Sequence, residues 1–518
     1  MPFRIQALCA VAAAVLLAVS AAAHADPLKV KTEQGKVHGK TINDGKVRAW
    51  LGLPYAAPPV GDLRWKAPQP AAKWKGERDA SKFAAHCAQN KVFEDMVFQG
   101  PGSSEDCLFL NVYASATADK NAKLPVMFWI HGGGFSGGGS DEPRHNGDFL
   151  PLKGVVLVTI NYRLGVFGFL ATADLAKEAN GAAGNYGFMD MVAALQWVEG
   201  NIEKFGGDPA NVTIFGESAG SMAVSTLMAS PMAQGLFHKA IGESGGAFSS
   251  GPRNMPLAAR EAHDAQWVAT RLKANSLAEL RALPTQAILD AAKRPGAGFW
   301  PDVDGKFLTE PAPDTYAAGK QAHVPMLAGW NKDEGGPNGV TTVEKWKAEA
   351  QRLFGDRAED FLKVYAADSD EQAARAAADF HGDQFIAYST WAWLEAQRKT
   401  GDAPVYRYHF ELQATPSKFH PGTVAFHSDD IEYVFGTLDT RPGWNVRPED
   451  RTLSDLIMTY WTNFARTGDP NGGDLPKWPK YNDDGYPLIH LDSTITSGPD
   501  ALRPRYEFLQ AGMPPMRF

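Results

Sequence analysis

The sequence is poor in cysteine, has no long apolar segment and carries no excess of positive charge. Only 3 of its 518 residues are cysteines. The apolar run Ala7–Ala18 is shorter than the roughly 18–20 residues of a transmembrane helix, and no later run is long enough. The formal net charge is −8, which argues against nucleic acid or an anionic membrane surface as a partner. We therefore expect neither a membrane span nor a nucleic-acid partner.

The first 25 residues have the pattern of a secretory signal peptide. Arg4 supplies the positive start, the apolar run follows, and Ala23-His24-Ala25 is a cleavage motif before Asp26. We expect an exported protein, in the periplasm or the medium. No linker, internal repeat or low-complexity tract divides the remainder, so we expect residues 26–518 to form one elaborated domain.

The cysteine count predicts one disulfide and no metal site. Cys9 belongs to the signal peptide, which leaves Cys87 and Cys107 as an even pair in an oxidising compartment. A bond between them would stabilise the fold by roughly 3 kcal/mol in the loop-entropy model. No histidines stand at ligand spacing beside these two cysteines. We expect neither a metal nor a cofactor.

Apolar runs that alternate with helical patterns predict an α/β fold. Three runs consist almost entirely of apolar or β-branched residues, as in strands covered on both faces: Pro125–Ile130, Val155–Asn161 and Val212–Phe215. Phe188–Phe205 has the period of an amphipathic helix. We expect a large, mixed, mostly parallel twisted sheet with helices on both faces. The Ala-rich stretches 253–289 and 343–399 read as helical insertions over the carboxyl end of that sheet.

A G-x-S-x-G motif within Asn211–Ala229 predicts a nucleophile. The motif occurs three times, around Ser136, Ser218 and Ser244. Only Ser218 stands between an apolar strand and a helix, the context in which a strained turn exposes a serine hydroxyl. The other two serines are interpreted as loop residues. Ser218 is therefore the candidate nucleophile.

A serine nucleophile needs a base, an acid that orients the base, and donors for the oxyanion. Asp333 and Glu334 follow a strand-like run, and both are candidate acids. The downstream histidines are candidate bases that spacing alone does not rank: His381, His409, His420, His427 and His490.

A glycine run supplies candidate oxyanion donors. Gly133 and Gly134 follow the first apolar strand and lack side chains, so their N–H groups are able to approach the reacting carbonyl. Ala219 contributes the N–H after the nucleophile. His131, at the head of the run, is interpreted as a packing residue rather than a second base.

Several longer motifs occur in order along the chain. They are S-E-D-C-L-F-L-N-V-Y, H-G-G-G-F, N-Y-R-L-G-V-F-G-F-L, F-G-G-D-P-A-N-V-T-I-F-G-E-S-A-G, N-K-D-E-G and H-S-D-D-I-E-Y-V-F-G. With these motifs the chain resembles the type-B carboxylesterases, the cholinesterase-like branch of the α/β hydrolases, from about Leu28 to Tyr506. The resemblance implies an α/β-hydrolase fold and a serine carboxylesterase that works through an acyl-enzyme.

The resemblance also assigns roles to individual residues. It implies Ser218 as nucleophile, Glu334 as acid and His427 as base, with Asp333 as a neighbour. It implies that Ser244 bonds the acid, and it aligns the two cysteines with the family's first disulfide. Glu217 is a candidate for tuning His427, or a locally bonded carboxylate. An amidase, thioesterase or lactonase with the same triad, and a non-catalytic binding protein, are the alternatives.

Two departures from relatives bear on the substrate. Cholinesterases hold a quaternary ammonium against a tryptophan in the first disulfide loop, where this chain has only Phe93 and Phe98, so we do not expect a choline esterase. Small residues at 296–298, where acetyl-selective relatives place bulky aromatics, predict a roomier acyl pocket for medium-acyl or aromatic esters. Trp391 and Trp393 are candidates either for the pocket wall or for the core.

Overall fold

The computed structural model describes residues 26–248, 255–293, 298–418 and 421–513. The predicted signal peptide, His420 and residues 296–297 of the predicted acyl pocket lie outside the described residues.

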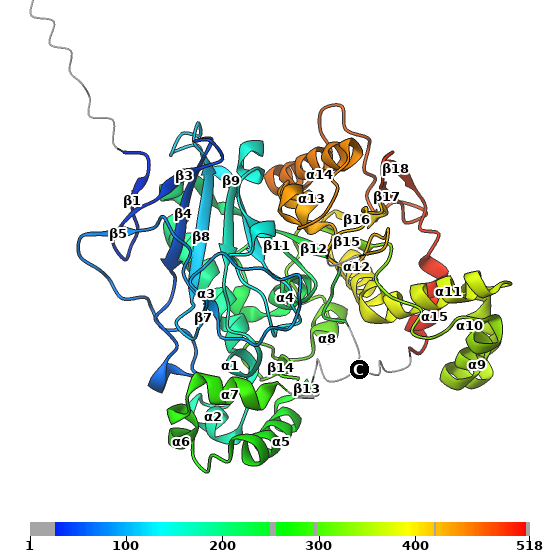
Figure 1. The fold of residues 1–518 in the computed structure, drawn as a ribbon, viewed down its shortest axis with the longest axis horizontal. Coiled ribbons are helices and arrows are strands. Elements are labelled where there is room, and N and C mark those ends of the chain that lie inside the picture. The colour runs from blue at the N-terminus through cyan, green and yellow to red at the C-terminus, as the bar shows by residue number, and fades with distance from the viewer. Residues whose placement is uncertain (1–25, 249–254, 294–297, 419–420, 514–518) are drawn as a thin grey trace, which may run out of the picture.

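One large mixed sheet dominates the described part of the chain (Figure 1). Its 11 strands, in spatial order, are β18 (Thr496–Gly498), β17 (Leu488–Leu491), β16 (Val405–Phe410), β15 (Met326–Asn331), β12 (Lys239–Glu243), β11 (Gly207–Glu217), β9 (Leu124–Ile130), β10 (Val156–Ile160), β8 (Phe109–Ser115), β4 (Val47–Pro54) and β3 (Lys40–Ile42). Every neighbouring pair from β17 to β10 is parallel, and the pairs outside this block are antiparallel. The predicted mixed, mostly parallel sheet is confirmed.

Three small sheets lie outside the main sheet among the described residues. One has three strands, β1 (Lys29–Lys31), β2 (Lys36–His38) and β5 (Glu77–Asp79). The other two are the pairs β6 (His86–Cys87) with β7 (Ser103–Ser104) and β13 (Met255–Pro256) with β14 (Asp302–Val303).

Side chains of the central strands alternate between two cores, one on each face of the sheet. Along β9, Phe128 and Ile130 belong to one core, whereas Met127 and Trp129 belong to the other. All four side chains are fully buried. A strand that is apolar at every position is thus explained by helices on both faces.

Fifteen α-helices lie among the described residues. They are α1 (Gly165–Phe169), α2 (Ala173–Glu178), α3 (Tyr186–Asn201), α4 (Ala219–Ala229), α5 (Leu257–Trp267), α6 (Leu277–Ala282), α7 (Thr285–Ala292), α8 (Ala312–Ala317), α9 (Val343–Phe354), α10 (Ala358–Val364), α11 (Asp370–Gly382), α12 (Tyr388–Thr400), α13 (Ile431–Phe435), α14 (Pro448–Thr467) and α15 (Arg503–Gln510). Helices α3, α4, α8 and α12 contribute to the first core, and α13 and α14 contribute to the second. The sequence predicts an amphipathic helix over Phe188–Phe205, with one apolar face. In the structure most residues of α3 are buried, so the helix is covered on more than that one face.

The two predicted insertions are helical. The first forms α5 to α7, which gather at one end of the molecule, and the second begins with α9 to α11 (Figure 1). Helices α9 to α11 pack with α15 around a separate apolar cluster that includes Trp346, Phe361 and Phe380. Helix α12 then packs against β15 and β16. This path brings the residues between α11 and α12 to the carboxyl end of β15.

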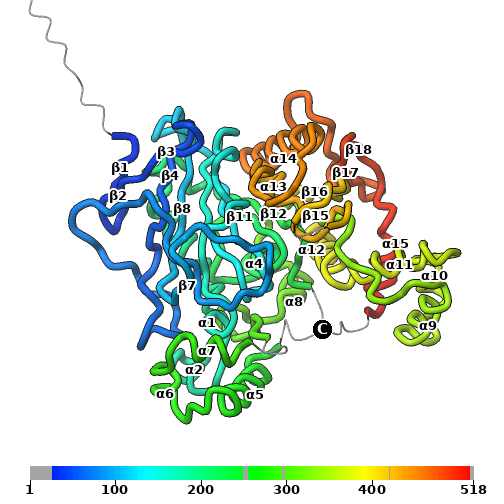
Figure 2. The backbone as a smooth tube through the Cα atoms, in the orientation of Figure 1, coloured from blue at the N-terminus to red at the C-terminus, as the bar shows by residue number. Residues whose placement is uncertain are grey.

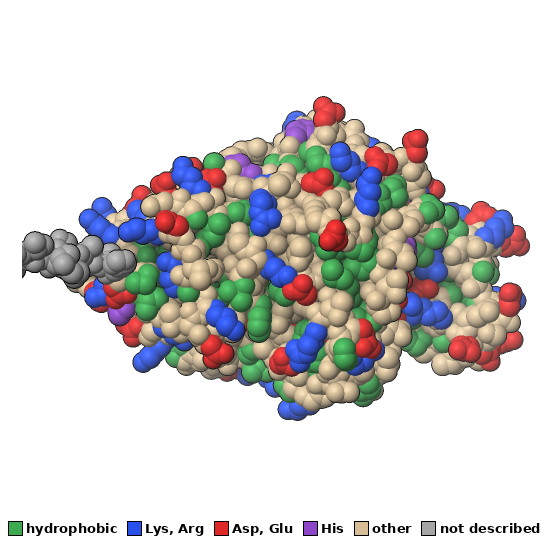
Figure 3. Space-filling model, turned by 90° about the horizontal axis from the view of Figure 1, so that it is seen from above, with side chains coloured by type: hydrophobic (Ala, Val, Ile, Leu, Met, Phe, Trp, Pro, Cys, Tyr) green, Lys and Arg blue, Asp and Glu red, His purple; other side chains and the backbone are tan. Residues whose placement is uncertain are grey.

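Cys87 and Cys107 form a disulfide, as predicted. The loop between β6 and β7 passes in front of α4 and β11 (Figure 2). Acidic and basic side chains are interspersed on the face that Figure 3 shows. Among the described residues, no helix combines the length and apolar character that crossing a membrane requires.

Candidate active site

Ser218 sits on a sharp turn between β11 and α4. Its φ of 56° and ψ of −119° form a strained conformation for a residue with a side chain. The flanking glycines permit this turn because β9 runs close beside it. A Cβ atom would lie 2.5 Å from the Ile130 oxygen at Gly216 and 2.0 Å from it at Gly220. The strand–turn–helix context predicted for Ser218 is therefore present.

Ser218, His427 and Glu334 form a hydrogen-bonded chain. Nδ1 of His427 lies 2.7 Å from Oε2 of Glu334, and Nε2 lies 2.9 Å from Oγ of Ser218. An ionised carboxylate only accepts hydrogen bonds, so the Nδ1–H donates to Glu334. Nε2 of the neutral ring is then left to accept the hydroxyl proton of Ser218. This arrangement has the geometry of a nucleophile, base and acid.

The chain is assembled at the carboxyl ends of parallel strands. Ser218 follows β11, Glu334 follows β15, and His427 stands in the connection between β16 and α13. Ligand sites in open α/β sheets occur at this edge. Residues that are more than 200 positions apart in sequence, such as Ser218 and His427 (a separation of 209), meet there.

The two neighbouring carboxylates after β15 have different partners. Oε1 of Glu334 accepts hydrogen bonds from the Ser244 hydroxyl at 2.6 Å and from the Asn331 N–H at 2.9 Å. Asp333 pairs with Arg375 and accepts from the Ala425 N–H at 2.9 Å. Of these two carboxylates, only Glu334 contacts His427.

The other candidate histidines within the described residues lie away from Ser218. Nδ1 of His381 lies 2.8 Å from the Gly336 oxygen. His409 and His490 both contact Glu411. His131 is buried and stacks on Tyr162 with ring centroids 4.5 Å apart, which is the packing role predicted for it. Of the described candidates, His427 is the one that reaches the serine.

Glu217 is a buried carboxylate beside the ring of His427. Its Oε1 lies 3.2 Å from Nε2 of His427, and its side chain is 4% exposed. Burial raises the pKa of Glu217 to about 8, against the opposing effect of His427. Burial disfavours the charged form of His427, but the carboxylates of Glu217 and Glu334 outweigh it and raise the pKa of His427 to about 9. The carboxylates therefore stabilise an imidazolium at this position.

The glycine run after β9 contributes free N–H groups. Gly133 and Gly134 have φ values of 102° and 61°, which L-residues with side chains rarely adopt. Among the described residues, neither of their N–H groups donates a hydrogen bond. Both glycines line the same cavity as Ser218 and Ala219. The predicted oxyanion donors and the predicted nucleophile thus face one space.

This space is a cavity of about 350 Å³. Its apolar lining comes from Val92, Phe93, Met96, Met222, Trp300, Phe385 and Ile431. The charged residues Asp95, Glu142, Arg144 and Glu217 also line it, and Arg144 pairs with Asp95 at 2.8 Å and with Glu142 at 3.3 Å. The cavity is therefore suited to an uncharged, largely apolar molecule.

Of the two alternatives for Trp391 and Trp393, the pocket wall or the core, the structure shows the core. Trp391 and Trp393 are buried core residues that do not line the cavity. Phe98 stacks on His86, with ring centroids 4.0 Å apart, and only Phe93 of the two loop phenylalanines lines the cavity. Of the small residues at 296–298, Gly298 is described, and a Cβ atom there would meet the Trp300 ring at 2.5 Å.

Two residues of the site were not predicted. Asp430 is buried near Glu334, accepts a hydrogen bond from Tyr408 at 2.7 Å and lies 3.2 Å from the side-chain nitrogen of Asn331. Its place in the sequence, three residues after His427 in the H-S-D-D motif, could have indicated that Asp430 lies near the site. Phe385 packs edge-on against the His427 ring at 4.9 Å. It comes from the insertion and had no local signal.

The fold and the arrangement of these residues define a class. A parallel sheet with helices on both faces, a strained serine at the strand–helix turn and a carboxylate–histidine pair at the same edge are the features of an α/β hydrolase. The model of the carboxylesterase family matches residues 26–508, and the chain belongs to this family. The resemblance seen in the motifs is confirmed.

Three relatives illustrate the match. Fumonisin B1 esterase of Sphingopyxis macrogoltabida is 35% identical over 91% of this chain and 88% of its own length. Para-nitrobenzyl esterase of Bacillus subtilis is 36% identical over 90% of this chain and 95% of its own length. Carboxylesterase 5A of Canis lupus familiaris is 35% identical over 94% of this chain and 88% of its own length. The protein is accordingly a carboxylic ester hydrolase.

Proposed function

We propose that this protein is a serine carboxylesterase in which Ser218 is acylated by the substrate. The observation that supports the proposal most strongly is the continuous chain from Ser218 through His427 to Glu334, with distances of 2.9 and 2.7 Å. The chain opens into an apolar cavity that free backbone N–H groups also face.

Acylation begins when Oγ of Ser218 attacks the ester carbonyl. Nε2 of His427 takes the hydroxyl proton, and Glu334 holds the ring in the required tautomer and stabilises the imidazolium. The carbonyl oxygen becomes an oxyanion, which the N–H groups of Gly133, Gly134 and Ala219 stabilise. His427 then returns the proton to the alkoxide, the alcohol leaves, and the acyl group remains on Ser218.

Deacylation repeats these steps with water. His427 removes a proton from water, the resulting hydroxide attacks the acyl-enzyme, and the second tetrahedral intermediate uses the same N–H groups. Its collapse releases the carboxylic acid and returns the proton to Oγ of Ser218. Ser244 and the Asn331 N–H keep Glu334 in position throughout, because both donate to its second oxygen.

For the substrate we propose uncharged esters with medium-length acyl or aromatic groups, rather than choline esters. The apolar lining supports this range, and so do the paired charges of Arg144, Asp95 and Glu142. Phe93 lines the cavity from the disulfide loop, which has no tryptophan for a quaternary ammonium. The relatives are named for esters as different as para-nitrobenzyl and fumonisin B1 esters, which favours a broad specificity.

We also propose that the protein is exported after cleavage before Asp26. The signal pattern of residues 1–25 supports this location. The disulfide between Cys87 and Cys107 is a second argument, because such bonds persist in oxidising compartments.

A series of p-nitrophenyl esters tests both the reaction and the acyl preference. We expect kcat/KM for the butyrate to equal or exceed that for the acetate, since the cavity has room for the longer chain. The Ser218→Ala variant should retain its thermal unfolding midpoint and lose on the order of 10⁴-fold or more in kcat with every ester. A steep fall from acetate to butyrate would refute the acyl preference. Substantial hydrolysis by Ser218→Ala would refute the mechanism, and a folded wild-type protein without any hydrolysis would indicate a binding protein.

A further inference from the structure

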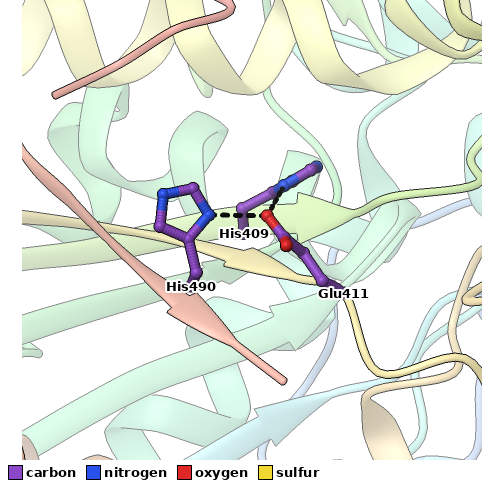
Figure 4. A group of neighbouring side chains, drawn as sticks. All are labelled: His409, Glu411 and His490. Carbon is purple, nitrogen blue, oxygen red and sulfur yellow. Dashed lines mark hydrogen bonds and ion pairs between the residues drawn. The ribbon is translucent and has the colours of Figure 1, made fainter. Parts of the chain in front are cut away.

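A second group of chemistry-bearing side chains lies at the edge of the main sheet, outside the active site. It consists of His409, Glu411 and His490, which face one another in Figure 4. Together these three residues are called the edge cluster below. No step of the proposed ester hydrolysis uses them.

The strand register creates the edge cluster. His409 of β16 and His490 of β17 are directly paired in parallel strands. Glu411 is two residues after His409, and the period of two in an extended chain places both on one face. The Glu411 N–H donates to the Leu491 oxygen at 2.8 Å, so the pairing with β17 continues to this residue. Neighbouring backbone hydrogen bonds therefore hold all three Cα positions.

Both histidines direct the same ring atom at one oxygen. Nδ1 of His409 lies 2.7 Å from Oε1 of Glu411, and Nδ1 of His490 lies 2.6 Å from the same oxygen. The three atoms all lie within 4.8 Å of one another. Two ring nitrogens and one carboxylate oxygen are therefore already gathered in one place, which is the first requirement of a metal site.

A small adjustment would make room for an ion. Zn²⁺ binds histidine nitrogen and carboxylate oxygen at roughly 2.0–2.2 Å in tetrahedral geometry, which separates its ligand atoms by about 3.3 Å. The Glu411 oxygen would have to withdraw from each ring by about half an ångström or slightly more, and the two Nδ1 atoms, which lie within 4.8 Å of each other, would have to take the same spacing of about 3.3 Å. The Glu411 side chain is 24% exposed and the His490 side chain 30% exposed, so both have space to move.

The surroundings of the edge cluster hold His409 in place and leave room for water beside it. His409 is buried, and Trp330 packs edge-on against its ring with centroids 6.2 Å apart. His409 also lines a cavity of about 190 Å³ that is large enough for water molecules. Arg407, two residues earlier on β16, forms an ion pair with the buried Asp500, which reduces its repulsion of a cation.

We propose that the edge cluster binds one divalent transition-metal ion of the Zn²⁺ type. Nδ1 of each histidine and one carboxylate oxygen are the protein ligands, and water completes the coordination. Each neutral ring carries its proton on Nε2 when Nδ1 binds the metal, and an imidazolium would release one proton to solvent. Two imidazoles with one carboxylate match Zn²⁺, Co²⁺, Ni²⁺ and Cu²⁺, whereas Ca²⁺ and Mg²⁺ prefer oxygen ligands.

Because the ligands come from two neighbouring strands, the bound ion would cross-link β16 and β17. An ion that binds the folded but not the unfolded chain stabilises the fold by mass action. This role is separate from the proposed ester hydrolysis, so failure of either proposal leaves the other standing.

Titration of the metal-depleted mature protein with Co²⁺ tests the site. After dialysis against EDTA, we expect absorption bands between about 500 and 700 nm that saturate at one ion per chain and disappear when Zn²⁺ is added. His490→Gln and Glu411→Gln should each weaken Co²⁺ binding by at least about tenfold, the lower limit for residues that merely support a ligand. Circular dichroism confirms that both variants are folded.

His381→Gln is the matched control, because it removes a partly buried histidine on α11 outside the edge cluster. It should bind Co²⁺ as the wild type does. Zn²⁺ should raise the thermal unfolding midpoint of the wild type and the control, but not of the two ligand variants. Absence of stoichiometric Co²⁺ binding, or equal binding by folded His490→Gln and Glu411→Gln, would show that the edge cluster is only a hydrogen-bonded link between strands.

Discussion

At the scale of single residues, the choice between Asp333 and Glu334 shows what a sequence leaves open. Both carboxylates follow the same strand, and residue chemistry does not distinguish them. The structure places Glu334 2.7 Å from His427, whereas Asp333 pairs with Arg375 on the neighbouring α11. The family resemblance implies Glu334 as the acid. The sequence does not indicate the partner of Asp333, because that contact depends on how α11 of the second insertion packs.

A matched pair of substitutions tests the proposed acid. Glu334→Gln should lower kcat by roughly 10³–10⁴-fold, because an amide no longer stabilises the imidazolium or enforces the Nδ1–H tautomer. Asp333→Asn should remain within about tenfold of the wild type, since Asp333 contacts Arg375 and the Ala425 N–H but not His427. The measurement is steady-state hydrolysis of p-nitrophenyl butyrate. The reverse order of the two losses would assign the acid to Asp333.

Glu217 should control the pH at which the enzyme becomes active. The proposed mechanism requires neutral His427, so kcat/KM should rise as the pH increases through the pKa of this residue. Nearby carboxylates, Glu217 first among them, overcome the effect of burial and raise that pKa to about 9. Glu217→Gln removes one of these charges, and the rise in kcat/KM should therefore move to lower pH.

The experiment compares the pH dependence of kcat/KM for wild type and Glu217→Gln with one uncharged ester. Asp95→Asn is a useful comparison, because Asp95 also lines the cavity but pairs with Arg144. A rise that stays at the same pH, or moves to higher pH, in Glu217→Gln would contradict the electrostatic role of Glu217.

At the scale of elements, the sequence predicts a tight turn from β11 to α4 but does not show which contact requires glycine on both sides of Ser218. The two glycines around Ser218 indicated a tight turn. The structure adds the reason, which is the Ile130 carbonyl of β9 lying where a side chain at Gly216 or Gly220 would begin. That contact depends on the pairing of β11 with β9, whose register the local sequence does not specify.

Gly220→Ala should therefore disrupt the turn. The added Cβ atom would meet the Ile130 oxygen at 2.0 Å, and backbone on both sides must move. We expect a loss of about 3 kcal/mol or more in the free energy of unfolding, together with reduced kcat. Gly498→Ala is the control, because a Cβ atom there meets nothing within 4 Å, and its effect should stay within about 0.5 kcal/mol. Equal midpoints of urea unfolding for the two variants would contradict this explanation.

At the scale of the whole molecule, the sequence predicted the fold class well because apolar strands and helical periods are local signals. The predicted sheet and disulfide are present in the structure. Contacts between distant segments were not predictable in the same way. Phe385 reaches His427 only through the path of α9 to α11, and the edge cluster forms only because β16 pairs with β17. His490 is 79 residues from Glu411, so no ligand spacing revealed it.

Different hydrogen-bond partners distinguish the three serines of the G-x-S-x-G motifs. Ser136 lines the same cavity, but its hydroxyl donates to the Gly134 oxygen at 3.2 Å. Ser244 donates to Glu334 at 2.6 Å. Only Ser218 of the three is bonded to His427. The central claim is therefore that the acyl-enzyme forms on Ser218.

Mass spectrometry of the mature protein after reaction with a fluorophosphonate tests this claim directly. A fluorophosphonate traps a serine that an adjacent base activates, so we expect one adduct per chain, complete loss of esterase activity, and a modified peptide in which Ser218 carries the phosphonyl group. Ser218→Ala should remain unlabelled. A stoichiometric adduct on Ser136 or Ser244, or undiminished ester hydrolysis by a protein fully labelled at Ser218, would contradict the account.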